Sequence, residues 1–540
     1  MKNRENTKSK ECIRILSFKR YLVELYRKYK FVTIFGLFIS VLLYSLMMSQ
    51  QLTNTFDGLW HQNYHQAGTA ELSSGRWMLI FADKFVMGLH AEPIASILTL
   101  ILFIIGFIFV LDLFRIEKRL YGCLSLFLFI SSTAISSTLS YRFTSFGYGI
   151  AYLFSILSVY AIVKCKKNIT AVMMGGIFLG ACMSCYQAYL AVFCVVTMFY
   201  IVFMCSRSDT IETKDVVRIL LRMGCSILIG AVFYVASLSL FLRLYQTSLS
   251  GYNGISGVTL GGMITSLAKN IIRSYQYFGA YFFMDILKIN RFQPVVWLLL
   301  AIFLILIMVI AIKIWKTKKQ RLVLLICATL AIPIASNAYI LVAGNKLELQ
   351  MTSGLAMFMS LTVILGFSCF NEKHCIQNIC MLLCIVLIYG NAMQVWVDQE
   401  AMYEGQNACE TIATHIIGDL QDEELLASNY DYYFVGVPAE NPFFSVSNIY
   451  YSANGYAQIG NFWVSGNCCQ MSYNGLINKH MGFDLPISYL HHETVVEKVN
   501  ILEMPIFPEN GYMTLIDDHT VVIKISEYKE YTGHSKYVFN

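Results

Sequence analysis

Charged residues are scarce in this chain, and so is proline. Of its 540 residues, 14% are Asp, Glu, Lys or Arg, whereas about 25% are charged in a typical soluble domain. Only 8 prolines and no low-complexity tract occur. The low charge excludes an ordinary soluble enzyme, and the few prolines and the absence of low-complexity tracts argue against a disordered or fibrous protein.

Two further absences narrow the function. No acidic or basic residue lies at the centre of any apolar segment long enough to cross a membrane, whereas ion-coupled carriers usually place such residues there. No paired Cys or Cys/His motif has zinc-site spacing, since Cys182 and Cys185 have no second pair. These absences disfavour an ion-coupled carrier and a zinc site of paired cysteines.

What the chain has instead is a series of apolar runs of about 20 residues, each long enough to span a bilayer. They predict an all-α polytopic membrane protein with about eleven transmembrane helices, or roughly nine to thirteen, because backbone amides must be paired within a bilayer. The predicted spans lie near residues 31–50, 94–114, 120–139, 144–163, 170–184, 187–205, 223–244, 295–314, 322–341, 350–370 and 375–396.

The apolar stretch 170–205 is too long for one span. A single helix would measure about 54 Å at 1.5 Å per residue, against a bilayer core of roughly 30 Å. Residues 184–187 (Ser-Cys-Tyr-Gln) form its polar break. Basic residues flank both ends of this stretch, at 164–167 and 207–218. Basic segments usually lie in the cytoplasm, and two segments on the same side of a membrane are separated by an even number of spans. We therefore expect two short helices here.

Positive charge is strongly biased to one side of the predicted spans. With eleven spans, 26 of the 40 Lys and Arg fall on the side of the amino terminus, and nine fall on the other side before residue 397. The positive-inside rule then predicts that residues 1–30 are a cytoplasmic basic tail and that the carboxyl tail lies outside. No cleavable signal peptide is evident, so we expect the first apolar run to remain as a helix.

Residues 397–540 differ sharply in composition from residues 31–396, the predicted transmembrane domain. They contain 19 Asp and Glu against 5 Lys, a formal charge of −14. A helix is predicted at 399–420 and strands at 430–437 and 520–526, which indicates a C-terminal extracytoplasmic α+β domain. A capping domain without chemistry is the plainest interpretation. A disulfide from Cys409 to Cys468 or Cys469 is left open.

Polar side chains gather in the predicted outer segments. In the first outer loop, residues 51–93, stretch 77–89 is expected to lie as a helix on the membrane surface. The fourth outer loop, 245–294, combines cations with aromatic residues, which suits either phosphate headgroups or simple interfacial anchoring. The ionisable and tryptophan side chains of the first loop include Asp57, Trp60, His61, His65, Glu71, Arg76, Trp77, Asp83 and Glu92.

Asp57 follows the first span directly, and its chemistry suggests a role. A carboxylate shielded from water has a raised pKa, which suits a general base. It could take the proton from an acceptor hydroxyl that attacks C1 of a sugar. The leaving lipid phosphate would need cations at the interface. A turn or helix-cap role is the plain alternative. The candidate cations are Arg142, Arg273, Arg243 and Lys269.

The order of these features resembles the bacterial O-antigen glucosyltransferases of the Gtr type-II family, which are membrane enzymes of glycosyltransferase-C architecture. The matching pieces are 54–60 (Asn-Thr-Phe-Asp-Gly-Leu-Trp), 75–77 (Gly-Arg-Trp), 140–143 (Ser-Tyr-Arg-Phe) and 184–189 (Ser-Cys-Tyr-Gln-Ala-Tyr). The resemblance implies a multi-pass protein of the bacterial plasma membrane, with a glycosyltransferase-C-like fold over residues 31–396.

The resemblance also implies a reaction and a site. Glucose or a related hexose would pass, with inversion, from undecaprenyl phosphate to a cell-surface glycan, with Asp57 as catalytic carboxylate. Expected partners are the polyprenyl-phosphate-linked sugar donor, the glycan acceptor, membrane lipid, and a companion flippase and donor synthase, but no nucleic acid. The sugar and acceptor pocket would include Trp60, His61, Glu71, Arg76, Trp77, Tyr141, Tyr186 and Gln187, with Arg142 beside them.

The chain departs from the family expectation at one point. A pair of acidic residues is expected in the first loop, but Phe56 occupies the first position of that pair. We therefore predict a metal-independent reaction and no cofactor, although Glu71, Asp83 or His61 could contribute a ligand to a divalent metal by folding back. Loss of turnover on chelation, with rescue by Mg²⁺ or Mn²⁺, would contradict this prediction.

Two functions of other classes remain open. A lipid-linked sugar flippase or other membrane carrier predicts a polar cavity through the spans and needs no outer carboxylate. A receptor or scaffold for the outer domain predicts that the first loop is replaceable.

Overall fold

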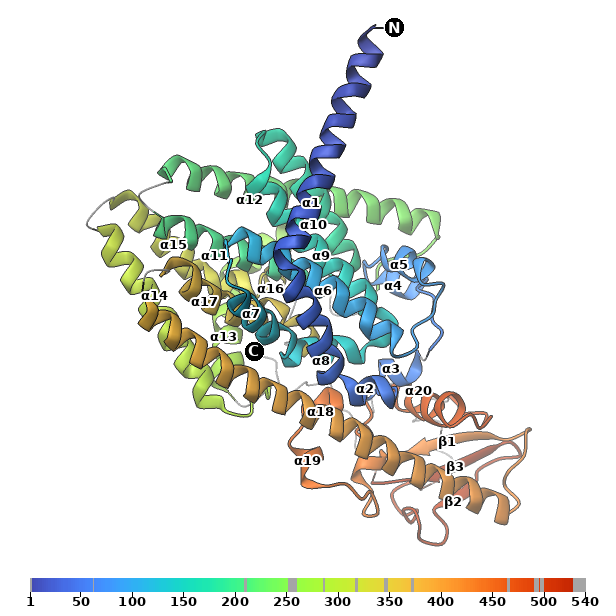
Figure 1. Ribbon diagram of the computed structural model, residues 1–540. Helices are drawn as coiled ribbons and strands as arrows, with labels where there is room; N and C mark the ends of the chain where they lie inside the picture. Colours follow the sequence, from blue (N-terminus) through green and yellow to red (C-terminus); the bar gives the residue numbers. More distant parts are fainter. Residues whose placement is uncertain are drawn as a thin grey trace.

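The computed structural model describes residues 2–61, 63–207, 211–250, 260–284, 287–315, 319–343, 348–370, 373–463, 467–489, 495 and 500–527. Figure 1 shows a bundle of helices from which the amino-terminal helix projects, and a small sheet beside the end of the bundle that carries α2 and α3. The bundle holds the apolar segments, and the sheet belongs to the acidic tail.

Every predicted span is largely helical. The bundle helices are α1 (Lys2–Leu43), α2 (Ser45–Ser49), α6 (Ile94–Leu113), α7 (Arg119–Ile130), α8 (Thr133–Ser140), α9 (Arg142–Lys164), α10 (Asn168–Cys185), η1 (Gln187–Tyr189), α11 (Leu190–Ser206), α12 (Thr213–Leu244), α13 (Leu260–Phe283), α14 (Gln293–Trp315), α15 (Lys319–Ser336), α16 (Ile340–Ala343), η3 (Leu349–Met351), α17 (Ser353–Cys369) and α18 (His374–Asp422).

The chain is a membrane protein. Within the described ranges, eight helices are long and apolar enough to cross a membrane, or nine if α7 and α8, bent by 54°, count as one span. The count of eleven is therefore not confirmed. The two remaining predicted spans lie in α1, whose apolar part ends at a break at Tyr44, and in α17, which has 17 residues.

The break in the apolar stretch 170–205 is confirmed. Helix α10 ends at Cys185, Tyr186 is extended, and the 3₁₀ turn η1 leads into α11. Gly176 and Gly180 of α10 lie against Gly230 of α12, where a Cβ at Gly230 would stand 3.1 Å from the Gly176 carbonyl oxygen. The small residues therefore allow the two helices to approach closely.

The predicted outer segments meet one another at one end of the bundle, which we call the loop end. The backbone N–H of Asn54 donates to the carbonyl oxygen of Ser140 (3.2 Å), and that of Met78 donates to Ser184 (3.1 Å). These bonds tie the first loop to the two turns that the sequence placed on the same side.

The predicted cytoplasmic segments meet at another end, the basic end. Lys164 and Lys28 both pair with Asp112, at 2.8 and 3.9 Å. The ammonium of Lys118 donates to Gln377 (3.4 Å), the fourth residue of α18. These contacts bring together segments that the charge pattern predicted on one side of the membrane.

The first loop, residues 51–93, contains three short helices: α3 (Asp57–Trp60), α4 (Thr69–Ser73) and α5 (Leu79–Phe85). Helix α5 confirms the helix predicted within 77–89. It buries Leu79 and Ile80 while Phe81 and Phe85 stay exposed, as expected for a helix with one face toward lipid.

The fourth loop contains a long helix, α13, that packs on the bundle. Phe278 and Phe282 of α13 contact Phe358 of α17, with ring centroids 5.3 and 5.4 Å apart. The aromatic residues of this loop are therefore partly used in packing, while Lys269 is exposed and Arg273 is half-buried.

Helix α18 has 49 residues and links the bundle to the sheet. The predicted tail helix 399–420 forms as its second half, and the expected boundary at 396/397 falls inside it.

The acidic tail forms a three-stranded sheet. The central strand is β3 (Thr520–Lys524), with β1 (Asp431–Val435) parallel on one side and β2 (Met513–Leu515) antiparallel on the other. Asp431 lies opposite Thr520, so both predicted strands are confirmed. The remaining elements of the tail are η4 (Pro438–Glu440), α19 (Asn448–Tyr451), η5 (Gly455–Ala457), α20 (Cys468–Asn474) and η6 (Gly475–His480).

The disulfide left open by the sequence is not formed. Cys409, Cys468 and Cys469 are all free thiols. Cys409 packs against Gly460, where a Cβ would lie 3.0 Å from its sulfur, whereas the Cys469 sulfur faces the Gly436 carbonyl at 3.5 Å. The two buried thiols therefore have different neighbours.

Candidate active site

Asp57 begins the short helix α3, and its position is fixed by the backbone around it. The Oδ1 atom of Asn54 accepts hydrogen bonds from the N–H groups of Phe56 (3.2 Å) and Gly58 (3.0 Å). An Asn side chain that binds these amides caps the helix start. Asp57 is thereby held at the amino end of α3, half-buried at the loop end.

The C-terminal segment covers this short helix. The N–H of Thr55 donates to the carbonyl oxygen of Tyr456 (3.2 Å), and the ring of Phe56 stacks on Trp463 with centroids 5.7 Å apart. Gly475 lies so close to Leu59 that a Cβ there would overlap the Leu59 carbonyl group. The acidic tail therefore packs directly on the loop that carries Asp57.

The surroundings of Asp57 raise the pKa of its carboxyl group toward neutral pH. Burial raises the pKa of the Asp57 carboxyl to about 6, the nearby Arg76 guanidinium opposes the shift, and the Glu348 carboxylate reinforces it. At neutral pH, Asp57 is therefore mostly ionised but close enough to its pKa to exchange a proton.

Arg76 lies among tyrosines. Its guanidinium carbon is 4.7 Å from the centroid of the Tyr186 ring, within cation–π range, and Tyr186 in turn stacks on Tyr148 at 4.2 Å. The Gln187 amide beside them donates to the Ser74 carbonyl oxygen at 3.2 Å.

Tyr141 and Glu348 complete this group. The amide of Gln350 donates to the Tyr141 hydroxyl (3.3 Å). Burial raises the pKa of Tyr141 well above its usual value, and the charges of Asp57 and Glu348 raise it further, so both carboxyls act on this phenol. We call Asp57, Arg76, Tyr141, Tyr186 and Glu348 the acid–arginine cluster.

Other predicted pocket residues lie in different surroundings. Trp77 is 6% exposed and stacks on Phe241 of α12, with ring centroids 4.6 Å apart. Trp60 lies beneath Lys479 of the tail, whose ammonium is 3.8 Å from the ring centroid. Both tryptophans thus have packing partners, and their predicted role in binding sugar stays a prediction.

The predicted phosphate-binding cations are dispersed. Arg142 is buried and donates to the Asn63 side chain (3.2 Å). Arg243 is exposed at the end of α12, and Lys269 and Arg273 lie on α13. The cation whose charge acts on Asp57 is Arg76, which the sequence had placed in the sugar pocket.

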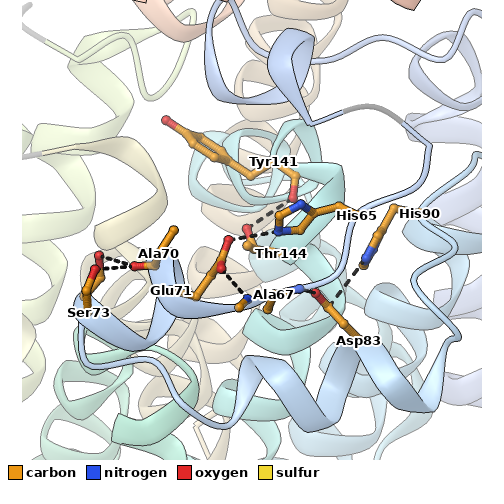
Figure 2. A network of polar contacts seen from close by, with 11 residues as sticks. His65, Ala67, Ala70, Glu71, Ser73, Asp83, His90, Tyr141 and Thr144 are labelled. Carbon is orange, nitrogen blue, oxygen red and sulfur yellow. Dashed lines mark hydrogen bonds and ion pairs between the residues drawn. The ribbon is translucent and has the colours of Figure 1, made fainter. Parts of the chain in front are cut away.

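A second polar group lies on the same loop and includes His61 and Glu71. Figure 2 shows that His65 points at Glu71, with 2.9 Å between the Nε2 and Oε1 atoms, and that His90 points at Asp83 (3.5 Å). The His61 ring lies beside His65, with centroids 4.3 Å apart.

The groups of this second site differ in protonation. Burial opposes ionisation of Glu71, but hydrogen bonds from His65 and the Gly68 N–H outweigh it and lower the Glu71 pKa to about 2. Burial and the neighbouring His65 lower the pKa of His61 to about 4. Burial raises the pKa of Asp83 to about 7, against the hydrogen bond from the Ala67 N–H. At neutral pH, the site therefore contains a neutral His61 and an ionised Glu71.

The sequence analysis missed Glu348 as a functional candidate. Glu348 lies just before the predicted span 350–370, on the side of the membrane predicted for Asp57. That position was the signal in the sequence that could have identified it. His65 was noted in the loop but given no role.

The family model described as Glucosyl transferase GtrII matches residues 60–371, which is more than half of the chain. The chain belongs to the GtrII glucosyl transferase family. No curated protein and no solved structure matches the chain.

Family membership confirms the resemblance stated from the sequence and makes the chain a glucosyltransferase-family membrane protein. The GtrII match includes Arg76, Tyr141, Tyr186 and Glu348 but begins three residues after Asp57. The match therefore does not test the catalytic role that the sequence predicts for Asp57.

Proposed function

We propose that this chain is an integral-membrane hexosyltransferase of glycosyltransferase-C-like architecture. It moves glucose, or a related hexose, from an undecaprenyl-phosphate donor to a glycan outside the bacterial plasma membrane. Membership of the GtrII family supports glucosyl transfer. The observation that carries the rest is Asp57, which is half-buried at the loop end with a pKa of about 6 and lies beside Arg76.

The loop end faces the outside in this proposal. The segments that meet at the basic end belong to the set with 26 of the 40 Lys and Arg residues, and such segments usually stay in the cytoplasm. The donor headgroup would then enter at the loop end, with its lipid tail along the apolar helices. The exposed Phe81 and Phe85 of α5 support this placement of the first loop at a lipid interface.

The proposed reaction needs one base and one cation. The Asp57 carboxylate takes the proton from the acceptor hydroxyl while that oxygen attacks C1 of the donor sugar. The bond from C1 to the phosphate oxygen breaks, and its electron pair leaves with the lipid phosphate. Attack from the face opposite the phosphate inverts the anomeric centre. Arg76 offsets the charge that develops on the leaving phosphate, and Tyr141 and Tyr186 suit the sugar ring.

Two partner reactions follow from the nature of this donor. A synthase must make the polyprenyl-phosphate hexose, and a flippase must bring its headgroup to the outer leaflet, because charged headgroups cross a bilayer poorly. We propose both proteins as companions of this chain. Membrane lipid surrounds its helices, and a surface glycan is its acceptor.

The proposed function is tested with radiolabelled donor. Membranes that contain the chain, incubated with undecaprenyl-phosphate [¹⁴C]glucose and surface glycan, are expected to form labelled glycan, whereas membranes without the chain are not. Other polyprenyl-phosphate hexoses, tested in parallel, identify the sugar. Label that changes leaflet but stays entirely lipid-linked would contradict the enzyme and indicate a carrier.

A further inference from the structure

Three side chains of the first loop converge in a way that glycosyl transfer does not require. His61 follows directly on α3, while Glu71 lies in α4, ten residues further along the chain. One ligand atom from each of His61, His65 and Glu71 can be chosen so that all three atoms lie within 4.8 Å of one another. Figure 2 shows the side chains of His65 and Glu71 pointing at each other.

One of these separations is already that of two ligands on a metal ion, and the others are within 4.8 Å. Zinc binds imidazole nitrogen and carboxylate oxygen at about 2.0–2.2 Å, so neighbouring ligand atoms stand roughly 3.0–3.5 Å apart. The His65 Nε2 and Glu71 Oε1 atoms are already 2.9 Å apart. His61 makes no hydrogen bond to any described residue through its ring, and it is half-buried, so its nitrogen atoms are not committed to another partner among these residues.

The surroundings orient these groups as a metal site requires. The second oxygen of Glu71 accepts a hydrogen bond from the Gly68 N–H (2.8 Å), which fixes the carboxylate plane. The Phe143 ring covers one side of the His61 ring, and the two ring centroids are 4.2 Å apart.

We propose that His61, His65 and Glu71 bind one divalent transition-metal ion, with Zn²⁺ as the expected ion. Two imidazoles and one carboxylate suit zinc and leave a fourth position for water. Magnesium and calcium prefer shells of oxygen ligands and are expected to bind far more weakly. This binding does not depend on the function proposed above.

The ion would hold the two halves of the loop together. The N–H of Arg76 donates to the carbonyl oxygen of Glu71 (2.9 Å), and the His61 N–H donates to that of Asp57 (3.0 Å). A metal that joins His61 to Glu71 would therefore fix the spacing of Asp57 and Arg76. The metal that the sequence disfavours would instead be chelated by an acidic pair at positions 56 and 57, of which Phe56 removes one member.

The test measures metal directly. The full chain is purified in detergent without added metal, treated with chelator, and titrated with Zn²⁺. Wild type is expected to bind about one ion per chain, and both His61→Ala and Glu71→Gln to weaken binding at least about 100-fold, as loss of a direct ligand should exceed the effect of second-shell changes. His415→Ala, an exposed histidine on α18, is the matched control and is expected to bind like wild type.

A second readout separates metal binding from folding. Zn²⁺ is expected to raise the unfolding temperature of wild type by about 3 °C or more and to leave that of His61→Ala unchanged, while Mg²⁺ moves neither. His61 donates no side-chain hydrogen bond within the described ranges, so its alanine variant should fold. Stoichiometric binding that is equal in wild type, His61→Ala and Glu71→Gln would overturn the proposal, as would the absence of Zn²⁺ binding to wild type.

Discussion

Replacement of Asp57 by asparagine is expected to lower the rate of sugar transfer by about 10²- to 10⁴-fold, the usual contribution of a general base. Asparagine has nearly the same shape, but its amide cannot take the proton from the acceptor hydroxyl. Because the Asn54 cap of α3 binds backbone amides and not the Asp57 side chain, the helix should form as before. The measurement is the initial rate of label transfer at saturating donor.

The matched control for this variant is Asp518→Asn, an exposed acid in the tail, which should transfer sugar at the wild-type rate. Asp57→Asn also separates the three classes of function. A scaffold would keep its function after this substitution, and a carrier would still move the lipid-linked sugar between leaflets. A folded Asp57→Asn protein with full transfer would rule out the role assigned to Asp57.

Two neighbours of Asp57 are expected to move its pKa in opposite directions. Arg76→Gln removes the cation that stabilises the Asp57 carboxylate, so the acidic limb of the pH–rate profile should move upward by about one pH unit. Glu348→Gln removes a like charge, so the same limb should move downward. The measurement is kcat/KM for transfer between about pH 5 and pH 8.

The direction of these shifts is a sharper test than the loss of rate. Arg76→Gln should also slow the reaction, because Arg76 offsets phosphate charge in the proposed mechanism, but a purely structural defect would not move the two midpoints apart. Arg218→Gln changes an exposed arginine at the basic end and should leave the profile unchanged. Equal midpoints in Arg76→Gln, Glu348→Gln and wild type would show that neither charge acts on the base.

The parts of the fold that could be predicted depend on local pattern. Hydropathy marked each apolar helix because a bilayer requires about 20 apolar residues in sequence. The break at 184–187 followed from length and charge parity, and the strands at 431–435 and 520–524 followed from β-branched and aromatic runs. The placement of Lys and Arg predicted which segments lie on one side of the membrane, and that topology stays a prediction.

What could not be predicted depends on contacts between distant parts of the chain. Glu348 acts on Asp57 across almost 300 residues, and no local pattern records that approach. Trp77 stays predicted to bind sugar, but the sequence could not show that its ring stacks on Phe241. The sequence could not show that His61, His65 and Glu71 converge, because their spacing along the chain matches no known metal-binding motif. Nor could it show that the last apolar helix continues without a break to Asp422.

The most direct test of the central claim is the pH dependence of kcat/KM in wild type and in Asp57→Asn, measured with the same labelled donor. Because Asp57 must be ionised to accept a proton, wild-type activity should rise with pH through a single acidic limb with a midpoint near 6. The residual activity of Asp57→Asn should lack that limb. The same limb in both proteins would show that another group is the base and would contradict the mechanism.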